Sequence, residues 1–499
     1  MRKEHSQRSF TKVCFRNILL LICCIALLPS LAQAETDKFI SLDELKPGMT
    51  GKVLSVFRGT EVESFRVELQ SIVEGPHPGQ KSMLLKVLDE SILLGSGFSG
   101  SPVYFDGRLA GAISHMEQNL AKQMVLAVPI SAMFQEASRV LPSGVPSPVA
   151  GKAEHKTEPG SMIYIPLVRG DFWIGSSGTL TWHDGNQLLA YGHENMFNGE
   201  TVPIPIHRAT VHAVIPKNDM SRKEASALEE IGSVTWDGKS ALVGQFGKKA
   251  AMTPFSLQYR SRSGEEKQYN LEMVNHTRVA PFVISLVVKS VLTTLVPNKP
   301  GGVDVEMTIT ANIKGLAAPV TITQRFNVEH LKSETAQFKP LLTALLFPLA
   351  DHASLSSLTI KMTELPDAKI GRIAEALFTR ARAVAGETVS LIVRLNGPFG
   401  ERKDIHIPVI IPRGFDRPVF EISVQSGSTV RPSEYPPGSM EDIAKWLSSI
   451  ARSDDLMVLS PGMAGASSYP EARINQVVVR TPWNLEGKVE ASINVVDRQ

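Results

Sequence analysis

The sequence predicts a mainly β protein built from several domains. Segments such as Phe65–Leu69 alternate apolar and polar residues, as half-buried strands do. Asp106-Gly107 stands between two apolar runs, a pattern typical of a tight hairpin. All three cysteines, Cys14, Cys23 and Cys24, fall near the start of the 499-residue chain, so later domains must be held by their own cores.

Residues 1–34 have the pattern of a signal peptide. A basic stretch ends at Arg16, the apolar run Asn17–Leu28 follows, and Pro29 breaks it. Ala32-Gln33-Ala34 then places small residues before an expected cleavage site after Ala34. The apolar run is shorter than the roughly 20 residues that span a bilayer. We therefore expect export to the periplasm or the extracellular space and no stable membrane insertion after cleavage; an uncleaved N-terminal anchor is the alternative.

Charge and motif content argue against nucleic-acid binding and against the usual zinc and phosphate sites. Residues 1–34 hold five basic residues and one acidic residue; without them, 47 basic and 49 acidic residues remain. Such a balanced chain has no electrostatic footprint for nucleic acid. HExxH and Walker-type motifs are absent from the sequence, and with them the usual signals of a zinc or phosphate site. We expect no cofactor and no metal, and the sequence does not specify an oligomeric state.

The expected modules follow one another along the chain. A second hairpin pattern lies at Thr179–Ala190, the segment Pro216–Ser226 predicts an exposed loop, and residues 279–296 predict a buried helix or strand pair. The predicted modules are a β-rich block at 35–145, a second at 146–275, a mixed α/β module at 276–375, a β-sandwich-like module at 376–430 and an α/β segment at 431–499, with a helix at Ser439–Ser453.

The segment that most directly suggests chemistry surrounds Ser99. Gly95, Gly97 and Gly100 flank this serine, and glycines let the backbone turn so that amide groups converge on one point. A serine peptidase needs such a loop, because two N–H donors must stabilise the developing oxyanion beside the hydroxyl. The alternative is an ordinary Gly/Ser loop between strands.

Several segments together resemble a known family. Gly97–Pro102 is similar to the nucleophile loop of chymotrypsin-like peptidases, and with Gly111–His115 it resembles the sporulation stage IV B (SpoIVB) serine peptidase family. Phe98 stands where that family usually has methionine. Tyr191–Glu194 resembles the segment that carries the family's catalytic histidine, and Leu85–Asp89 resembles the strand that ends in its aspartate.

The resemblance implies a fold and a set of roles. The fold is two packed chymotrypsin-like β-barrels, at 35–145 and 146–275, followed by the sandwich-like and α/β modules. Ser99 would be the nucleophile, His193 the base, Asp89 the third triad member, and the amides of Gly97 and Ser99 the oxyanion hole. Ser99 precedes His193 here, the reverse of the family's order, which predicts a circular permutation.

Alternatives stay open for the site and for the function. His115 follows the serine loop closely and is a substitute candidate for the base, whereas His183 and the Asp-Gly turns at Asp106 and Asp184 fit turn chemistry. The expected function is an exported serine endopeptidase acting on envelope proteins or on itself. A catalytically inactive envelope scaffold or binding protein on the same fold is the alternative.

Overall fold

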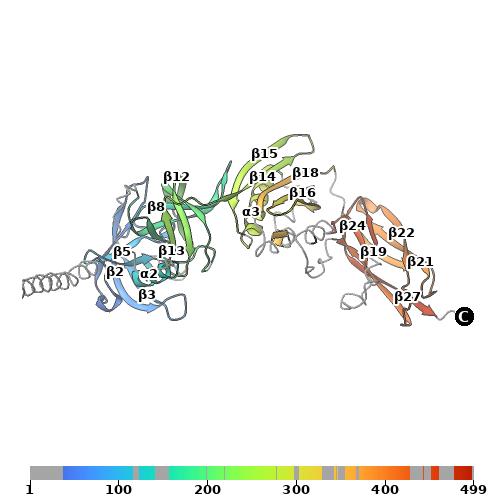
Figure 1. Ribbon diagram of the computed structural model, residues 1–499, viewed down its shortest axis with the longest axis horizontal. Coiled ribbons are helices and arrows are strands. Elements are labelled where there is room, and N and C mark those ends of the chain that lie inside the picture. The colour runs from blue at the N-terminus through green and yellow to red at the C-terminus, as the bar shows by residue number, and fades with distance from the viewer. Residues whose placement is uncertain are drawn as a thin grey trace, which may run out of the picture. The chain divides into compact units, whose positions relative to one another are not determined.

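The computed structural model describes most of the chain and divides it into two compact units (Figure 1). One unit is Met1–Leu167 with Trp173–Ala251, and the other is Val168–Phe172 with Met252–Gln499. The described residues are 38–115, 123–140, 157–197, 199–217, 220–276, 278–296, 303–328, 342–343, 345–346, 355–366, 370–427, 442, 451–459 and 477–496. The predicted signal segment lies outside them, as does most of the predicted helix Ser439–Ser453.

The first unit begins with a closed six-stranded barrel in the order β1-β2-β3-β7-β6-β5. Its strands are β1 (Thr50–Ser55), β2 (Glu63–Glu74), β3 (Lys81–Val87), β5 (Pro102–Phe105), β6 (Arg108–Ile113) and β7 (Met124–Pro129), after a short 3₁₀ helix, Leu42–Glu44. Alternate residues such as Phe65, Val67 and Leu69 fill the barrel core. Asp106 and Gly107 have φ values of 50° and 75°, which confirms the predicted tight hairpin.

The second sheet of this unit curls back on itself. Its strands are β8 (Met162–Gly170), β9 (Ile174–Asp184), β10 (Gln187–Ala190), β11 (Ile204–Ile215), β12 (Ser221–Asp237) and β13 (Leu242–Phe246), in the order β11-β12-β13-β10-β9-β8. Strand β11 also pairs with β8, at His207↔Tyr164 and Arg208↔Ile163. The short strand β4 (Gly95–Ser96), which leads into the Ser99 loop, joins this sheet by parallel pairing with β12.

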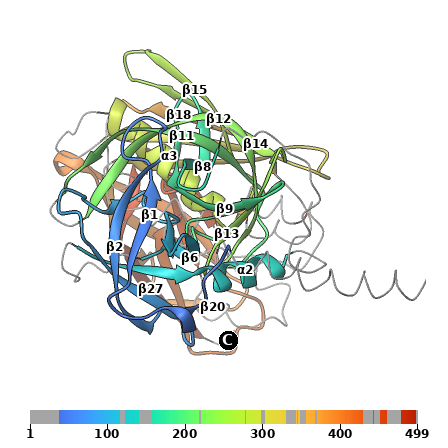
Figure 2. The same ribbon diagram turned by 90° about the vertical axis from the view of Figure 1, so that its left-hand side faces the viewer.

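An apolar cluster joins the barrel to the second sheet. Leu109 and Val128 of the barrel pack with Leu189 and Val243 of the second sheet. Helix α2 (Ile130–Ser138) covers this joint, as Figure 2 shows on the side facing the viewer. The joint is buried like a domain interior, so the two β-layers form one folded body.

The second unit contains a sheet, a buried helix and a sandwich. The sheet runs from the end of β8 through β15 (Glu266–Val274), β14 (Met252–Arg260), β18 (Leu355–Glu364), β16 (Asp304–Ile313) and β17 (Val320–Asn327). Helix α3 (Ala280–Leu295) has nine buried residues, which confirms a buried helix in the apolar stretch 279–296. Within the described residues, no helix has the length and apolar content needed to cross a membrane.

Two further sheets share one core and make the sandwich. Their strands are β19 (Ile370–Phe378), β20 (Arg382–Val384), β21 (Thr388–Asn396), β22 (Arg402–Ile410), β23 (Val419–Ser426), β24 (Asp455–Leu459), β25 (Val477–Arg480), β26 (Asn484–Glu486) and β27 (Lys488–Val496), with a 3₁₀ helix at Pro398–Gly400. The orders are β22-β21-β19-β26 and β20-β27-β23-β24-β25. Leu391 and Val393 of the first sheet pack with Phe420 and Val424 of the second.

Charged side chains connect the sandwich to the β16–β17 hairpin. The fully buried Asp304 carboxylate accepts hydrogen bonds from Arg325 Nη2 (3.1 Å), Asn327 Nδ2 (3.1 Å) and Asn484 Nδ2 (2.9 Å). Burial raises the pKa of Asp304, although Arg325 and the two amides act in the opposite direction. These residues and their neighbours form one polar network, which we call the Asp304 network. Its members are Asp304, Glu306, Arg325, Asn327, Arg452, Ser453, Asp454 and Asn484.

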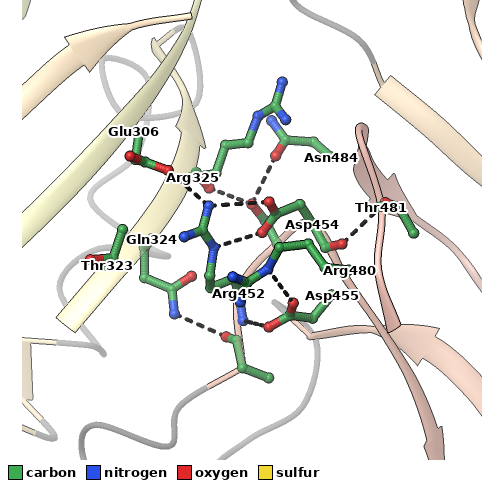
Figure 3. Close-up of polar contacts among 12 residues, drawn as sticks. Glu306, Thr323, Gln324, Arg325, Arg452, Asp454, Asp455, Arg480, Thr481 and Asn484 are labelled. Carbon is green, nitrogen blue, oxygen red and sulfur yellow. Dashed lines mark hydrogen bonds and ion pairs between the residues drawn. The ribbon is translucent and has the colours of Figure 1, made fainter. Parts of the chain in front are cut away.

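Arg452 lies at the centre of the same contact region (Figure 3). Its guanidinium donates to Glu306 Oε2 at 3.0 Å and, through Nε, to Asp454 Oδ1 at 2.8 Å. Ser453 Oγ donates to the Arg325 carbonyl and contacts Asn484 Oδ1 at 2.8 Å. Charged groups of both signs are thus paired where the hairpin and the sandwich meet.

The structure bears on the sequence predictions in different ways. The mainly β fold is confirmed, and the closed barrel with its curled neighbour is consistent with two chymotrypsin-like barrels. The exposed-loop prediction for Pro216–Ser226 is wrong in its second half, because β12 begins at Ser221 and buries both Ser221 and Lys223. The predicted circular permutation stays a prediction.

Candidate active site

The Ser99 loop, residues 97–101, connects β4 of the second sheet to β5 of the barrel and turns sharply. Gly97 and Gly100 adopt φ values of +94° and +90°, a region that glycine enters without the cost of a side chain. Phe98 between them is fully buried in the barrel core and holds the loop down. Ser99 itself is half-buried, and its Oγ donates to the Ser114 carbonyl at 3.2 Å.

Strand β9 of the second sheet fixes this loop from the other side. The Thr179 amide donates to the Ser99 carbonyl at 2.8 Å, and Thr181 Oγ1 donates to the Gly100 carbonyl at 2.7 Å. A Cβ atom on Gly100 would lie 2.1 Å from the Thr179 carbonyl oxygen and 2.4 Å from the Tyr191 nitrogen. The nucleophile candidate is therefore held where the two β-layers touch.

Two backbone amides of the loop donate to no acceptor among the described residues. Among the hydrogen bonds of the described residues, none is donated by the amide of Gly97 or by the amide of Ser99. Neighbouring amides are used, since Phe98 donates to the Gly95 carbonyl and Gly100 to the Ile113 carbonyl. These are the two amides that the family resemblance assigns to an oxyanion hole, and that assignment stays a prediction.

The segment that carries His193 turns toward the Ser99 loop. Tyr191 and Gly192 have φ values of 68° and 69°, and the Tyr191 amide donates to the Thr179 carbonyl at 3.3 Å. The His193 ring centroid lies 5.0 Å from that of His115, which directly follows Ser114. The structure thus brings Ser99, His115 and His193 into one neighbourhood from segments far apart in the sequence.

The hydrogen bond at one ring nitrogen of His193 fixes its tautomer. Nδ1 lies 2.6 Å from the backbone carbonyl oxygen of Glu194. A carbonyl oxygen can only accept, so Nδ1 carries the proton, and in the neutral ring Nε2 is the free base. This is the tautomer that a general base for a serine hydroxyl requires.

Asp237 supports the His193 turn and was not foreseen from the sequence. Its carboxylate is almost fully buried and accepts hydrogen bonds from the amides of Asn195 (2.8 Å), Met196 (2.8 Å) and Phe197 (2.7 Å). Hydrogen bonds to a buried carboxylate are stronger than those between neutral groups. The only sequence signal was the dipeptide Asp237-Gly238, which indicates a turn and nothing more.

Two more histidines belong to the surroundings. His115 Nδ1 lies 2.8 Å from Ser114 Oγ, and burial, assisted by the neighbouring His193, lowers the pKa of His115. His77 Nε2 lies 3.2 Å from Glu194 Oε2 and thereby ties the loop between β2 and β3 to the His193 turn. His115 was a sequence candidate, whereas His77 was not.

Asp89, the predicted third triad member, lies just beyond the end of the barrel strand β3. Its carboxylate accepts hydrogen bonds from the Arg66 amide (2.7 Å), Nε (3.1 Å) and Nη2 (2.7 Å), and these bonds lower the pKa of Asp89. Within the described residues, no hydrogen bond joins Asp89 to a histidine, nor Ser99 to His193. The triad role of Asp89 stays a prediction.

Comparison with known families adds to this geometry. Residues 32–134 match the family model for SpoIVB peptidase S55. The S55 segment contains the first barrel and both Ser99 and His115, and it ends before His193. No curated protein matches the chain. The S55 match supports a serine peptidase.

Proposed function

We propose that the protein is an exported serine endopeptidase in which Ser99 is the nucleophile and His193 the general base. The observation that carries the proposal is the meeting of the Ser99 loop with the Tyr191–His193 turn, through the Thr179 backbone, inside a chain with an S55 segment. Acyl transfer needs a hydroxyl, a base and an oxyanion site in one place. The described geometry supplies a candidate for each.

The steps follow from the groups present. Rotation of the Ser99 side chain away from the Ser114 carbonyl frees its hydroxyl to attack a peptide carbonyl carbon while His193 Nε2 takes the proton. The amides of Gly97 and Ser99 receive the oxyanion. As the C–N bond breaks, the imidazolium gives that proton to the leaving amine, and a water activated by the same ring releases the acyl group.

At Nδ1 the carbonyl of Glu194 takes the place where the family has a carboxylate. A carbonyl orients the ring, as a carboxylate does, but it stabilises the imidazolium less because it has no full charge. The assignment of Asp89 as third member stays a prediction from the resemblance, since its carboxylate accepts from Arg66, and the Glu194 carbonyl is the proposed partner of His193 Nδ1. Substrates are proposed to be envelope proteins or the chain itself, after removal of the signal segment.

A fluorophosphonate probe tests the proposal directly. The full chain should be labelled covalently at Ser99, with labelling lost in Ser99→Ala and strongly reduced in His193→Ala. His115→Ala is the matched control for the choice of base, because its ring lies 5.0 Å from that of His193. A reversed pattern, in which His115→Ala loses labelling and His193→Ala keeps it, would assign the base to His115.

A non-catalytic envelope scaffold is the second candidate. The observation that favours it is the hydrogen bond of Ser99 Oγ to a backbone carbonyl instead of to an imidazole. The same probe separates the two candidates: a folded chain that is never labelled, at any pH between 6 and 9, would be the scaffold.

A further inference from the structure

Lys223 on β12 is a buried amine among uncharged neighbours. The residue is only 5% exposed, its Nζ donates to Ser55 Oγ at 2.7 Å, and the same atom lies 3.9 Å from the centre of the Phe98 ring. No ion pair of the described residues includes Lys223. Burial alone lowers the pKa of Lys223 well below its usual value, which favours the neutral amine.

A chain of buried hydroxyl groups starts at this amine and crosses between the two β-layers. Ser55 Oγ of β1 lies 2.9 Å from Ser101 Oγ, and Ser101 Oγ lies 3.3 Å from Thr179 Oγ1 of β9. Thr179 Oγ1 in turn donates to the Gly97 carbonyl at 3.0 Å. Ser55, Ser101 and Thr179 are all fully buried, so water does not compete for their hydrogen bonds.

The direction of the donors along this chain is fixed by its last link. A carbonyl only accepts, so Thr179 must give its single hydroxyl proton to Gly97. Ser101 must then donate to Thr179, and Ser55 to Ser101. Ser55 is left needing a donor, and Lys223 supplies it.

The chain ends on the Gly97–Phe98 peptide, which lies between the two peptides that carry the proposed oxyanion amides. The Gly97 carbonyl shares its peptide plane with the Phe98 amide, and the Gly97 amide is one of the two proposed oxyanion donors. Lys223 also contacts the loop directly through the Phe98 ring, and it leaves little room for a side chain at Gly97, where an added Cβ would lie 3.1 Å from Lys223 Cβ. The pairing of Ser221 and Arg222 with β4 brings β12 to this point.

We propose that Lys223 is a positioning residue. It is the donor end of a buried hydroxyl chain that fixes the Gly97–Phe98 peptide, and thereby the amides of Gly97 and Ser99 on either side of it. This inference rests on the proposed serine peptidase function. Lys223 acts through Ser55, Ser101 and Thr179 and does not touch a substrate. Its chemical role is to supply one hydrogen bond without bringing a counter-ion into the loop.

The groups that face Lys223 make a neutral amine suitable for this role. Strand β1 offers the Ser55 hydroxyl and the nucleophile loop offers the Phe98 ring, neither of which is charged. On β12 the neighbours Arg222 and Glu224 pair with each other at 2.7 Å. A proton added to Lys223 would therefore introduce a buried charge with no carboxylate bonded to it.

The first experiment measures fluorophosphonate labelling rates in the full chain. Lys223→Met and Thr179→Val remove opposite ends of the chain, and each should slow labelling of Ser99 about tenfold, the equivalent of one hydrogen bond. Because both act through the same chain, the double variant should be no slower than either single variant. Lys249→Met, which removes an exposed lysine, is the control and should label like the unmodified chain.

The second experiment does not depend on peptidase activity. In a Ser99→Ala background labelled with ¹⁵N-phenylalanine, the Phe98 amide resonance reports the hydrogen bond on the Gly97 carbonyl. Lys223→Met and Thr179→Val should move it in the same direction. Ser55→Ala, which interrupts the chain one link further on, replaces Lys223→Met if that variant does not fold.

The outcomes separate the inference from the proposed function. Unchanged labelling and an unmoved Phe98 resonance in folded Lys223→Met would overturn the positioning role, as would effects that simply add in the double variant. If the unmodified chain is never labelled, the proposed function fails. The Phe98 resonance then decides alone whether Lys223 fixes the loop.

Discussion

The two units each contain a buried polar network, and the two networks are built on opposite principles. The Asp304 network packs several charges of both signs together, with Asp304 and Arg325 joined at 3.1 Å. The network at the Ser99 loop has a single ionisable group, Lys223, and otherwise only hydroxyls and a carbonyl. Paired buried charges hold two elements together because removing one partner leaves the other charge buried and uncompensated. A neutral hydrogen-bonded chain can fix a peptide without creating a strong local electric field.

The largest expected effect comes from breaking the charged network. Asp304→Ala leaves Arg325, Asn327 and Asn484 without their common acceptor and should cost about 3–5 kcal/mol in the unfolding free energy of the second unit. Calorimetry on the full chain should show a lower unfolding temperature for that unit. Asp304→Asn keeps the shape and one acceptor oxygen, so its loss should be smaller. Equal losses would mean that shape, and not charge, holds the joint.

The next largest effect on stability is expected at Gly100, which packs closely against Thr179 of the neutral network. Gly100→Ala adds both left-handed strain and a collision with the Thr179 carbonyl, and should destabilise the first unit by about 2 kcal/mol or more. Gly48→Ala is the matched control, because Gly48 has φ +87° but no atom within 4 Å of its added Cβ. The control should cost only about 1 kcal/mol of strain. Denaturant unfolding of both variants measures the difference in their unfolding free energies. Equal losses would mean that the collision with the Thr179 carbonyl does not contribute.

The neutral network should respond to pH in a direction that the charged one does not share. The pKa of Lys223 is lowered in the folded state, so the unfolded chain binds a proton that the folded chain has released. Stability relative to Lys223→Met should therefore rise as pH increases from 7 toward the usual lysine value of 10.5. At pH 7 the Met variant should be at least as stable as the unmodified chain. Thermal unfolding at several pH values tests this, and a flat or falling difference would contradict a neutral Lys223.

The smallest effect is expected at the exposed pair Arg66–Asp89. Water screens ion pairs at the surface, so Asp89→Asn should change stability very little. Its effect on fluorophosphonate labelling is the more useful measurement. We expect less than about a tenfold change, because within the described residues the Asp89 carboxylate accepts from Arg66 and not from a histidine. A loss of several orders of magnitude would restore Asp89 as the third triad member.

The sequence predicted those features that depend on local pattern. Alternation and the Asp106-Gly107 turn predicted the barrel hairpins, and the spacing of glycines around Ser99 predicted the sharp turns that Gly97 and Gly100 adopt. Lys223 was missed because Ser221–Glu224 is polar, and polar segments usually lie in water. The pairing of β12 with β4, a contact between segments more than a hundred residues apart, brings that lysine against the Ser99 loop and β1.

Asp237 and His77 show the same limit at the His193 turn. Nothing near Asp237 in the sequence indicates that its carboxylate receives three amides from residues 195–197. Nothing near His77 indicates that it reaches Glu194. Long-range polar contacts of this kind leave no period or composition in the sequence, and so they could be found only in three dimensions.

The dependence of the Ser99 loop on strands from the second sheet has a consequence for biosynthesis. A ribosome releases Ser99 well before it has made Thr179, His193 and Lys223. Until those segments are made and fold, the loop lacks its hydrogen bonds with Thr179 and Thr181 and the nearby His193 ring. On the proposed function, the nascent chain would therefore be inactive during translation, and during any export in an unfolded state, without needing a separate inhibitor.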